Sequence, residues 1–313
     1  LPTPEALRET ESPGPGAPSP AHPLLTPHQH KEPAMTTTTA ITSPARSGGS
    51  AGSAAAPARR PRPWTYTRID TLTTLARPDM LFFTLIMPLG MYLFWGALQD
   101  YSSLGAGRGN VAASIMINMS VFSVAIAATC TAAGAAVENA GGWGRQMALT
   151  AGGLRIYITT KLLTALIVSV FPVTVIFIAG IFTGARMDAP WVWAAGYLLT
   201  LLAAVPFACY GLAVGLWVPA QAAVGIAGAS ISIYAFLGNL FMPLSGSLFD
   251  FGRFTPMYGT GALATRALQK DIVYTTAGDV REALWVPVAN IAVWTLIFVV
   301  ACLAARRRTT ARH

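Results

Sequence analysis

The sequence has little charge, little histidine and little cysteine, and each scarcity excludes a class of protein. Charged residues make up only 11% of the 313 residues and hydrophobic residues make up 53%, which is too apolar for a soluble globular chain. The four histidines, at positions 22, 28, 30 and 313, lie near the two ends, so neither histidine-dependent catalysis nor a histidine-bound metal is expected between them. The sequence therefore indicates an integral membrane protein.

Motifs of enzyme chemistry are also missing. Cys130, Cys209 and Cys302 lie separately in apolar runs without CxxC spacing, so neither a disulfide framework nor a metal site is indicated. The chain has no Asp-x-x-x-Asp pair for diphosphate and magnesium, and no Gly-x-x-x-x-Gly-Lys-Ser/Thr loop for a nucleotide. We therefore expect a chain that is not an enzyme, holds no cofactor of its own and does not hydrolyse ATP.

Six apolar stretches are long enough, at about 20 residues each, to cross a bilayer as helices. They cover residues 80–99, 111–133, 160–183, 190–216, 220–242 and 284–304. The fourth and fifth are separated only by Trp217 to Pro219, which predicts a tight helical hairpin. Small residues in these two stretches, such as Gly211 and Gly225, favour close helix packing, either within one subunit or between two copies. The predicted fold class is all-α and polytopic, with six transmembrane helices.

The interior of the predicted spans is polar in places but not ionisable. A charge at mid-bilayer costs about 2.5 to 3.5 kcal/mol, and ion-coupled transporters keep such residues as relays. None lies at the centre of a span, because Lys161 is at the edge of the third. The neutral polar residues suited to interhelical hydrogen bonds or weak substrate contacts are Asn118, Ser120, Ser123, Ser230, Ser232, Asn239 and Asn290. A transporter of this composition would need a partner to deliver energy.

The flanking segments define the domain plan. Residues 1–63 are rich in Pro, Ser, Thr, Ala and Gly, which predicts a disordered tail, and Met35 is an alternative start to Leu1. Residues 64–76 place Trp64, Ile69 and Leu72 on one side of a helix and Asp70 on the other, as in a helix that lies in the membrane interface. The six-span domain is expected over 64–308 and a short cytoplasmic tail over 309–313.

Basic residues give the expected orientation. The formal net charge is +8, and most basic residues beside the spans lie on the side of the N-terminal tail, the 134–161 connection and the Arg306–Arg308 run. By the positive-inside rule, this side and both termini are cytoplasmic. The chain is expected to contact membrane lipids and no nucleic acid. Abundant Arg, Ala and Gly beside very few Lys suggest a bacterial genome, so we expect the bacterial cell membrane.

The connection between the second and third spans carries a recognisable pattern. The pattern begins with a glutamate and a glycine, continues with three residues between further glycines, and ends with an aromatic and a basic residue. These are Glu138, Gly142, Arg145, Met147, Thr150, Tyr157 and Lys161. This pattern resembles the membrane subunits of type-2 ABC exporters, the daunorubicin-type drug exporter family, which have Glu-Arg-x-x-Gly-x-x-Arg-x-Leu-x-x-Thr-Pro in this place. The chain departs from it at Asn139 and Ala151, where the family has Arg and Pro.

The resemblance implies a six-span permease subunit that works as a dimer with two copies of a separate ATPase subunit, which binds ATP and Mg. It implies that Glu138, Gly142, Arg145, Met147 and Thr150 form the ATPase contact. As charged groups at a cytoplasmic surface, Glu138 and Arg145 are expected to be dispensable for folding. The external segment 243–283, with Pro256-Met257-Tyr258, resembles the family's short helices that dip into the outer leaflet, either as an outer gate or as an interfacial loop.

Other functions remain open at this stage. The expected activity is ATP-driven export of a lipophilic drug, antibiotic, lipid or glycan, which the sequence does not distinguish. A non-transporting sensor or assembly subunit that docks a cytoplasmic partner is the alternative, and a membrane enzyme is a third. Whether the dimer has two identical permeases is equally open, and the 134–161 connection would be a plain solvated linker if the resemblance fails.

Overall fold

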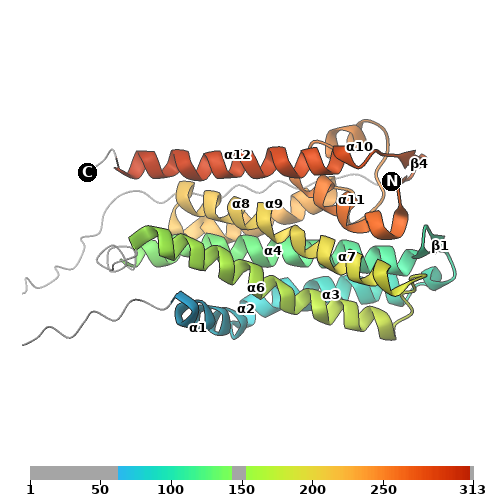
Figure 1. Cartoon of the computed structure of the whole chain (residues 1–313), viewed down its shortest axis with the longest axis horizontal. Coiled ribbons are helices and arrows are strands. Elements are labelled where there is room, and N and C mark those ends of the chain that lie inside the picture. The colour runs from blue at the N-terminus through green and yellow to red at the C-terminus, as the bar shows by residue number, and fades with distance from the viewer. Residues whose placement is uncertain (1–62, 143–152, 311–313) are drawn as a thin grey trace, which may run out of the picture. The chain divides into compact units, whose positions relative to one another are not determined.

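The computed structural model describes residues 63–142 and 153–310, and these are mostly helical (Figure 1). Six helical stretches among them are long and apolar enough to cross a membrane. They are Pro78–Ala97, Val111–Ala135, Tyr157–Phe182, Pro190–Trp217, Ala220–Leu237 and Trp285–Ala305. The six predicted spans are thus confirmed as helices of membrane-spanning length. The predicted tails, residues 1–63 and 309–313, lie almost wholly outside the described residues.

The first span is irregular, and its sequence explains why. It runs through α2 (Pro78–Leu81), the π-helical turn η1 (Phe82–Ile86), α3 (Met87–Tyr92) and a second π-helical turn, η2 (Leu93–Ala97). Pro88 has no N–H to donate to the carbonyl of Thr84 one turn earlier. The hydroxyl of Ser123, on the second span, donates to that carbonyl instead. Neighbouring helices make proline tolerable inside a membrane in this way.

Helix α4 (Val111–Ala140) is the buried centre of the bundle, since most of its span is covered by protein. It contacts α6 (Gly153–Phe182), α8 (Ala204–Trp217) and α9 (Ala220–Leu237). Its many alanines, serines and threonines allow close approach. A Cβ added to Gly211 of α8 would lie 2.1 Å from the carbonyl oxygen of Thr129, so this glycine serves packing within the chain. A Cβ on Gly225 of α9 would meet no atom within 4 Å.

The fourth span bends, and the fifth span ends, at positions that the hydropathy pattern does not indicate. The fourth consists of α7 (Pro190–Leu202) and α8, which are separated by a turn at Ala203 just before Pro206. The fifth ends at Leu237, not at residue 242 as predicted, because the chain turns at Asn239 with φ of +64°. Asn tolerates this left-handed conformation better than most residues. Its side-chain oxygen accepts from the N–H of Leu244 and its amide donates to the carbonyl of Tyr274.

The segment after the fifth span folds against the bundle. It forms α10 (Gly246–Gly252), α11 (Pro256–Gln269) and a hairpin of β3 (Ile272–Thr275) and β4 (Gly278–Arg281), before α12 (Trp285–Thr310) begins. Helix α11 is buried on nearly every side and contacts α4, α7, α9 and α12. Backbone that enters a membrane needs such protein cover.

Two short antiparallel hairpins correct the predicted all-α class to a mostly helical one. In the second, Ile272 pairs with Arg281 and Thr275 with Gly278. The first joins β1 (Gly105–Ala106) to β2 (Gly109–Asn110), after the one-turn helix η3 (Asp100–Ser102). Both hairpins lie at the end of the bundle opposite to α1 (Pro63–Leu75), as Figure 1 shows. The two ends of the spans are therefore built differently.

Candidate functional site

A buried cluster of charges joins three helices at the end of the bundle where α1 lies. Lys161 lies about one helical turn inside the third span, and its side chain is only 3% exposed. Its ammonium lies 2.7 Å from Oδ1 of Asp70 on α1 and 2.5 Å from Oε1 of Glu138 near the end of α4. A buried lysine is stabilised only when its charge is paired. Lys161 therefore holds α1 and α4 against α6.

Tyr157 completes what we call the Lys161 cluster, namely Asp70, Glu138, Tyr157 and Lys161. The hydroxyl of Tyr157, one turn before Lys161 on α6, donates to Oε2 of Glu138 at 2.9 Å and lies 3.1 Å from the carbonyl of Ala135. Both oxygens of Glu138 are thus occupied by groups of α6. The two residues at the end of the sequence motif bind the residue at its beginning.

The cluster carries two carboxylates and one ammonium group. The Asp70 side chain is 12% exposed and the Glu138 side chain 36%, so Glu138 is the member nearer to solvent. Oδ2 of Asp70 is buried and has no hydrogen-bond partner among the described residues. By formal charge, the cluster has one negative charge in excess.

Helix α1 has the expected two faces, although its polar face is turned toward protein. Asp70 is nearly buried and Thr67 and Thr71 are buried, one turn before and one residue after it. Trp64 and Leu72 on the other face are exposed. An apolar face that points outward suits lipid, whereas the polar face finds its partner in Lys161.

The structure places only part of the predicted ATPase contact. Glu138 is in the cluster, and Gly142 lies in the turn just after α4 with φ of +86°, a conformation that glycine adopts easily. Arg145, Met147 and Thr150 lie outside the described residues. The Glu138 carboxylate pairs with a buried lysine, so we now expect its loss to destabilise the fold, and its dispensability for folding is untested. Its role toward a partner stays a prediction.

Asp70 is the member of the cluster that sequence reasoning missed. It was placed on the polar side of an interfacial helix, which leaves it in water. The available signal was Lys161 itself, a basic residue at a span edge that would need a carboxylate nearby.

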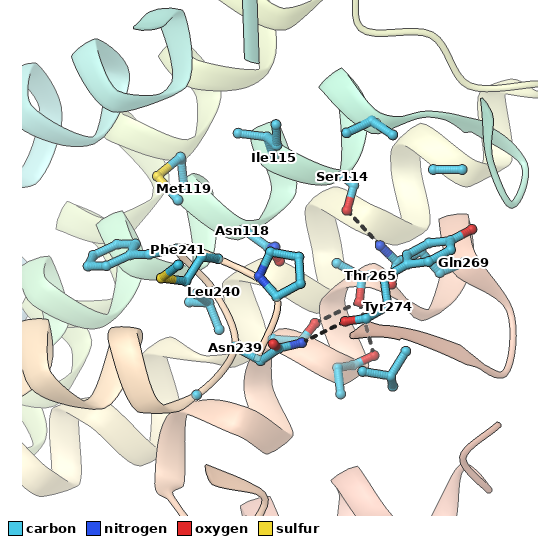
Figure 2. Close-up of a pocket in the computed structure, with 18 of the residues that line it drawn as sticks. Ser114, Ile115, Asn118, Met119, Asn239, Leu240, Phe241, Thr265, Gln269 and Tyr274 are labelled. Atoms are coloured by element: carbon cyan, nitrogen blue, oxygen red, sulfur yellow. Dashed lines mark hydrogen bonds between the residues drawn. The ribbon is translucent and has the colours of Figure 1, made fainter. Parts of the chain in front are cut away.

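A cavity of about 680 Å³, shown in Figure 2, is lined in part by α4. It lies far along this helix from the cluster. Asn118, in its wall, and Glu138 are 20 residues apart on one helix (138 − 118), which corresponds to about 30 Å. The other walls come from the first span, the segment from η3 to β1, the end of α9 with the segment after it, α11 and β3. The substrate path is unknown from the sequence; of the seven neutral polar residues suited to interhelical hydrogen bonds or weak substrate contacts, Asn118 and Asn239 line this cavity.

A second ionic contact fixes the helix that walls this cavity. Glu282, buried beside the start of α12, accepts from the hydroxyl of Tyr258 at 2.9 Å and from Arg253 at 2.8 Å. Burial lowers the pKa of Arg253, but its bond to Glu282 outweighs this and the net pKa is raised. Burial, and then the Glu282 carboxylate, raises the pKa of the Tyr258 hydroxyl well above its ordinary value. The contact ties α11 to α12.

No protein-family model matches the chain, and no curated protein matches it either. Among the described residues, no group of three or more His, Cys, Asp or Glu side chains could hold a metal ion. Membership of the type-2 ABC exporter family therefore stays a prediction from the 138–161 motif.

Proposed function

We propose that this chain is the permease subunit of an ATP-driven exporter in the bacterial cell membrane. A separate ABC ATPase subunit binds ATP and Mg, and its movements are passed to the spans. The permease works as a dimer, and an apolar substrate leaves the cell through it. The Lys161 cluster is the observation that carries this proposal.

The Lys161 cluster contains residues from both ends of the connection between the second and third spans. Glu138 lies four residues before Gly142, and Tyr157 and Lys161 lie in the first turns of α6. A force on residues 143–152 would reach Glu138 and Lys161 together, because the pair is short and Lys161 is buried. Separating charges in such a pair costs several kcal/mol, about 3 to 5. The ends of α4 and α6 would then move as one unit.

Asp70 extends this unit to α1. A push on the connection would also displace α1, since Asp70 shares Lys161 with Glu138. The exposed Trp64, Ile69 and Leu72 fit a helix that floats at the lipid surface and follows such a displacement. The cluster therefore supports a coupling role for Glu138, Gly142, Arg145, Met147 and Thr150.

The proposed orientation places the cluster in the cytoplasm, where ATP is. Arg77, next to α1, is exposed and pairs with Asp79, and the Arg306–Arg308 run ends the last span. Basic residues gather on the cytoplasmic side of membrane proteins. Both chain termini are cytoplasmic in this orientation, and the cavity then lies toward the outside, as export requires.

A purification experiment tests the proposal. The tagged chain, isolated from native membranes in mild detergent, should carry a second protein that hydrolyses ATP. Arg145→Ala should lower its recovery, because truncating one partner of a buried charge pair costs about 2 to 5 kcal/mol. Arg281→Ala is the matched control, since Arg281 is exposed on β4 at the other end of the bundle.

Each outcome has a distinct meaning. Loss of the ATPase in Arg145→Ala and not in Arg281→Ala supports the exporter. A stably associated cytoplasmic partner without nucleotide hydrolysis would instead favour the sensor or assembly subunit and refute ATP-driven export.

A further inference from the structure

We infer that the 680 Å³ cavity binds an uncharged, mainly apolar molecule whose neutral polar group hydrogen-bonds to Asn118. That this molecule is the exported substrate rests on the proposed function. Its binding does not, because the cavity belongs to the chain alone.

The size and walls of the cavity suit a molecule of about drug size. Ligand pockets typically measure about 300 to 1,000 Å³ and are mostly apolar with a few polar groups. Met91, Trp95, Met119 and Phe241 provide much of the apolar surface, with two methionine side chains that adapt to different shapes. The walls come from elements far apart in the sequence, so the cavity is a product of the fold.

The walls carry no formal charge. Among the described residues that line the cavity there is no Asp, Glu, Lys, Arg or His. A charged ligand would lose its hydration here without gaining a counter-charge, and the cost of burying an unpaired ion is many kcal/mol. The lining therefore selects against cations and anions of otherwise suitable shape.

Most polar groups at the cavity already have partners within the protein. The Gln269 amide donates to the Ser114 hydroxyl at 2.6 Å, and Asn239 binds the backbone at Leu244 and Tyr274, as Figure 2 shows in part. These bonds connect the walls to each other.

Asn118 is different. Its side chain lines the cavity and makes no hydrogen bond to any described residue (Figure 2). An amide inside the apolar part of a span is unfavourable unless it is paired, by about 1 to 3 kcal/mol. Because the fold does not use this amide, it is free to donate to, or accept from, a bound molecule.

The cavity is also accessible. Trp95 on η2 and Met242 after α9 line it, yet they are 52% and 49% exposed. The cavity is therefore unsealed between the first span and the segment that follows the fifth. An apolar molecule can enter there from the surrounding lipid, without crossing the hydrogen-bonded wall of α11.

Direct binding to the purified chain in nanodiscs, without any ATPase, tests this inference. Three radiolabelled probes differ in charge: progesterone, which is neutral with two carbonyl acceptors, the tetraphenylphosphonium cation and the tetraphenylborate anion. Only progesterone should show saturable binding. Ile115→Trp should abolish it by filling the cavity, whereas Ile233→Trp, the same change on the exposed face of α9, should not.

Variants of Asn118 test the polar contact. Asn118→Leu should weaken progesterone binding about five- to tenfold, the equivalent of one hydrogen bond, without lowering the stability of the fold, because the amide is unpaired there. Asn118→Asp should let the cation bind, since it places a carboxylate in the cavity.

Several results would overturn the inference. Equal binding by all three probes, or equal binding by Ile115→Trp and Ile233→Trp, would mean partition into lipid only. Wild-type affinity in Asn118→Leu would mean an apolar site without the polar contact. A chain that binds progesterone in this way but has no ATP-hydrolysing partner would refute the proposed function and leave the site standing. A chain that has an ATP-hydrolysing partner but does not bind progesterone in this way would refute the binding site and not the proposed function.

Discussion

Removing the charge of Asp70 should destabilise the fold, although the sequence predicts Asp70 on the polar side of an interfacial helix. In Asp70→Asn, the Lys161 ammonium loses the carboxylate 2.7 Å away and keeps only Glu138, which is the more exposed of the two. Lys161 is 3% exposed, so water cannot replace the lost partner without opening the contact between α1 and α6.

The magnitude follows from distance and burial. Two unit charges 2.7 Å apart attract by about 6 kcal/mol at an effective dielectric constant of 20, before the cost of desolvation. Breaking a buried pair typically costs about 3 to 5 kcal/mol. Because Glu138 remains as a partner, we expect a smaller loss, about 2 to 3 kcal/mol in the free energy of unfolding.

The chain contains its own control. Asp79 also lies 2.7 Å from its basic partner, Arg77, but both side chains are 56% exposed. An exposed pair contributes only about 0 to 1 kcal/mol. Asp79→Asn, the same chemical change at the same distance, should therefore leave stability nearly unchanged.

Equilibrium unfolding in mixed micelles of increasing SDS content measures the difference. Cys209 and Cys302 are also free and are less buried, so both are replaced by alanine; the reaction of the buried Cys130 with a thiol-reactive fluorophore then reports unfolding. Equal transition midpoints for Asp70→Asn and Asp79→Asn would show that the cluster is not a buried ionic network, and the coupling argument built on it would fail.

Three further predictions concern other parts of the fold, each tested by the same unfolding assay. Ser123→Ala should lower the free energy of unfolding by about 1 kcal/mol, because its hydroxyl donates to a carbonyl of the first span that has lost a donor to proline. Ser120→Ala should lower it little, because that hydroxyl bonds within its own helix. Equal losses would contradict this role of Ser123. Gly211→Ala should lower the free energy of unfolding by about 1 to 3 kcal/mol, because the added methyl group overlaps α4. Gly225→Ala, where the methyl group has open space, should stay within about 0.5 kcal/mol of wild type. A tolerated Gly211→Ala would show that the two helices can separate. Burial and a neighbouring carboxylate raise the pKa of Tyr258, so the stability it contributes is complete below the ordinary tyrosine pKa of about 10 and is lost as pH rises above it. Wild type should thus lose stability above about pH 10 more steeply than Tyr258→Phe, and parallel curves would contradict this.

The spans could be predicted from sequence because each depends on one local property, a sufficient length of apolar residues. The same property misplaced the end of the fifth span. Residues 238–242 remain largely apolar, but Asn239 adopts a left-handed conformation that hydropathy does not record. The β3–β4 hairpin had a local signal, β-branched Ile272 and Val273 followed by a turn at Gly278, which the dominant helical pattern obscured.

The candidate site could be predicted only in part, because its contacts are long-range. Lys161 and Asp70 are 91 residues apart in the chain, and no periodicity relates them. Glu138 and Lys161 were found through the motif, yet their mutual pairing was not. The cavity around Asn118 depends on the shape of several elements far apart in the sequence and leaves no local pattern beyond a neutral polar residue in a span.

The central claim is that residues 143–152 take energy from an ATPase. It is tested most directly by a photo-crosslinking amino acid placed at position 145, with position 281 as the control, in native membranes that also receive a photoreactive ATP analogue. The account predicts a crosslinked product at position 145, and not at 281, that contains an ATP-labelled subunit. Crosslinks at position 145 to lipid alone, or to a protein that ATP does not label, would contradict it.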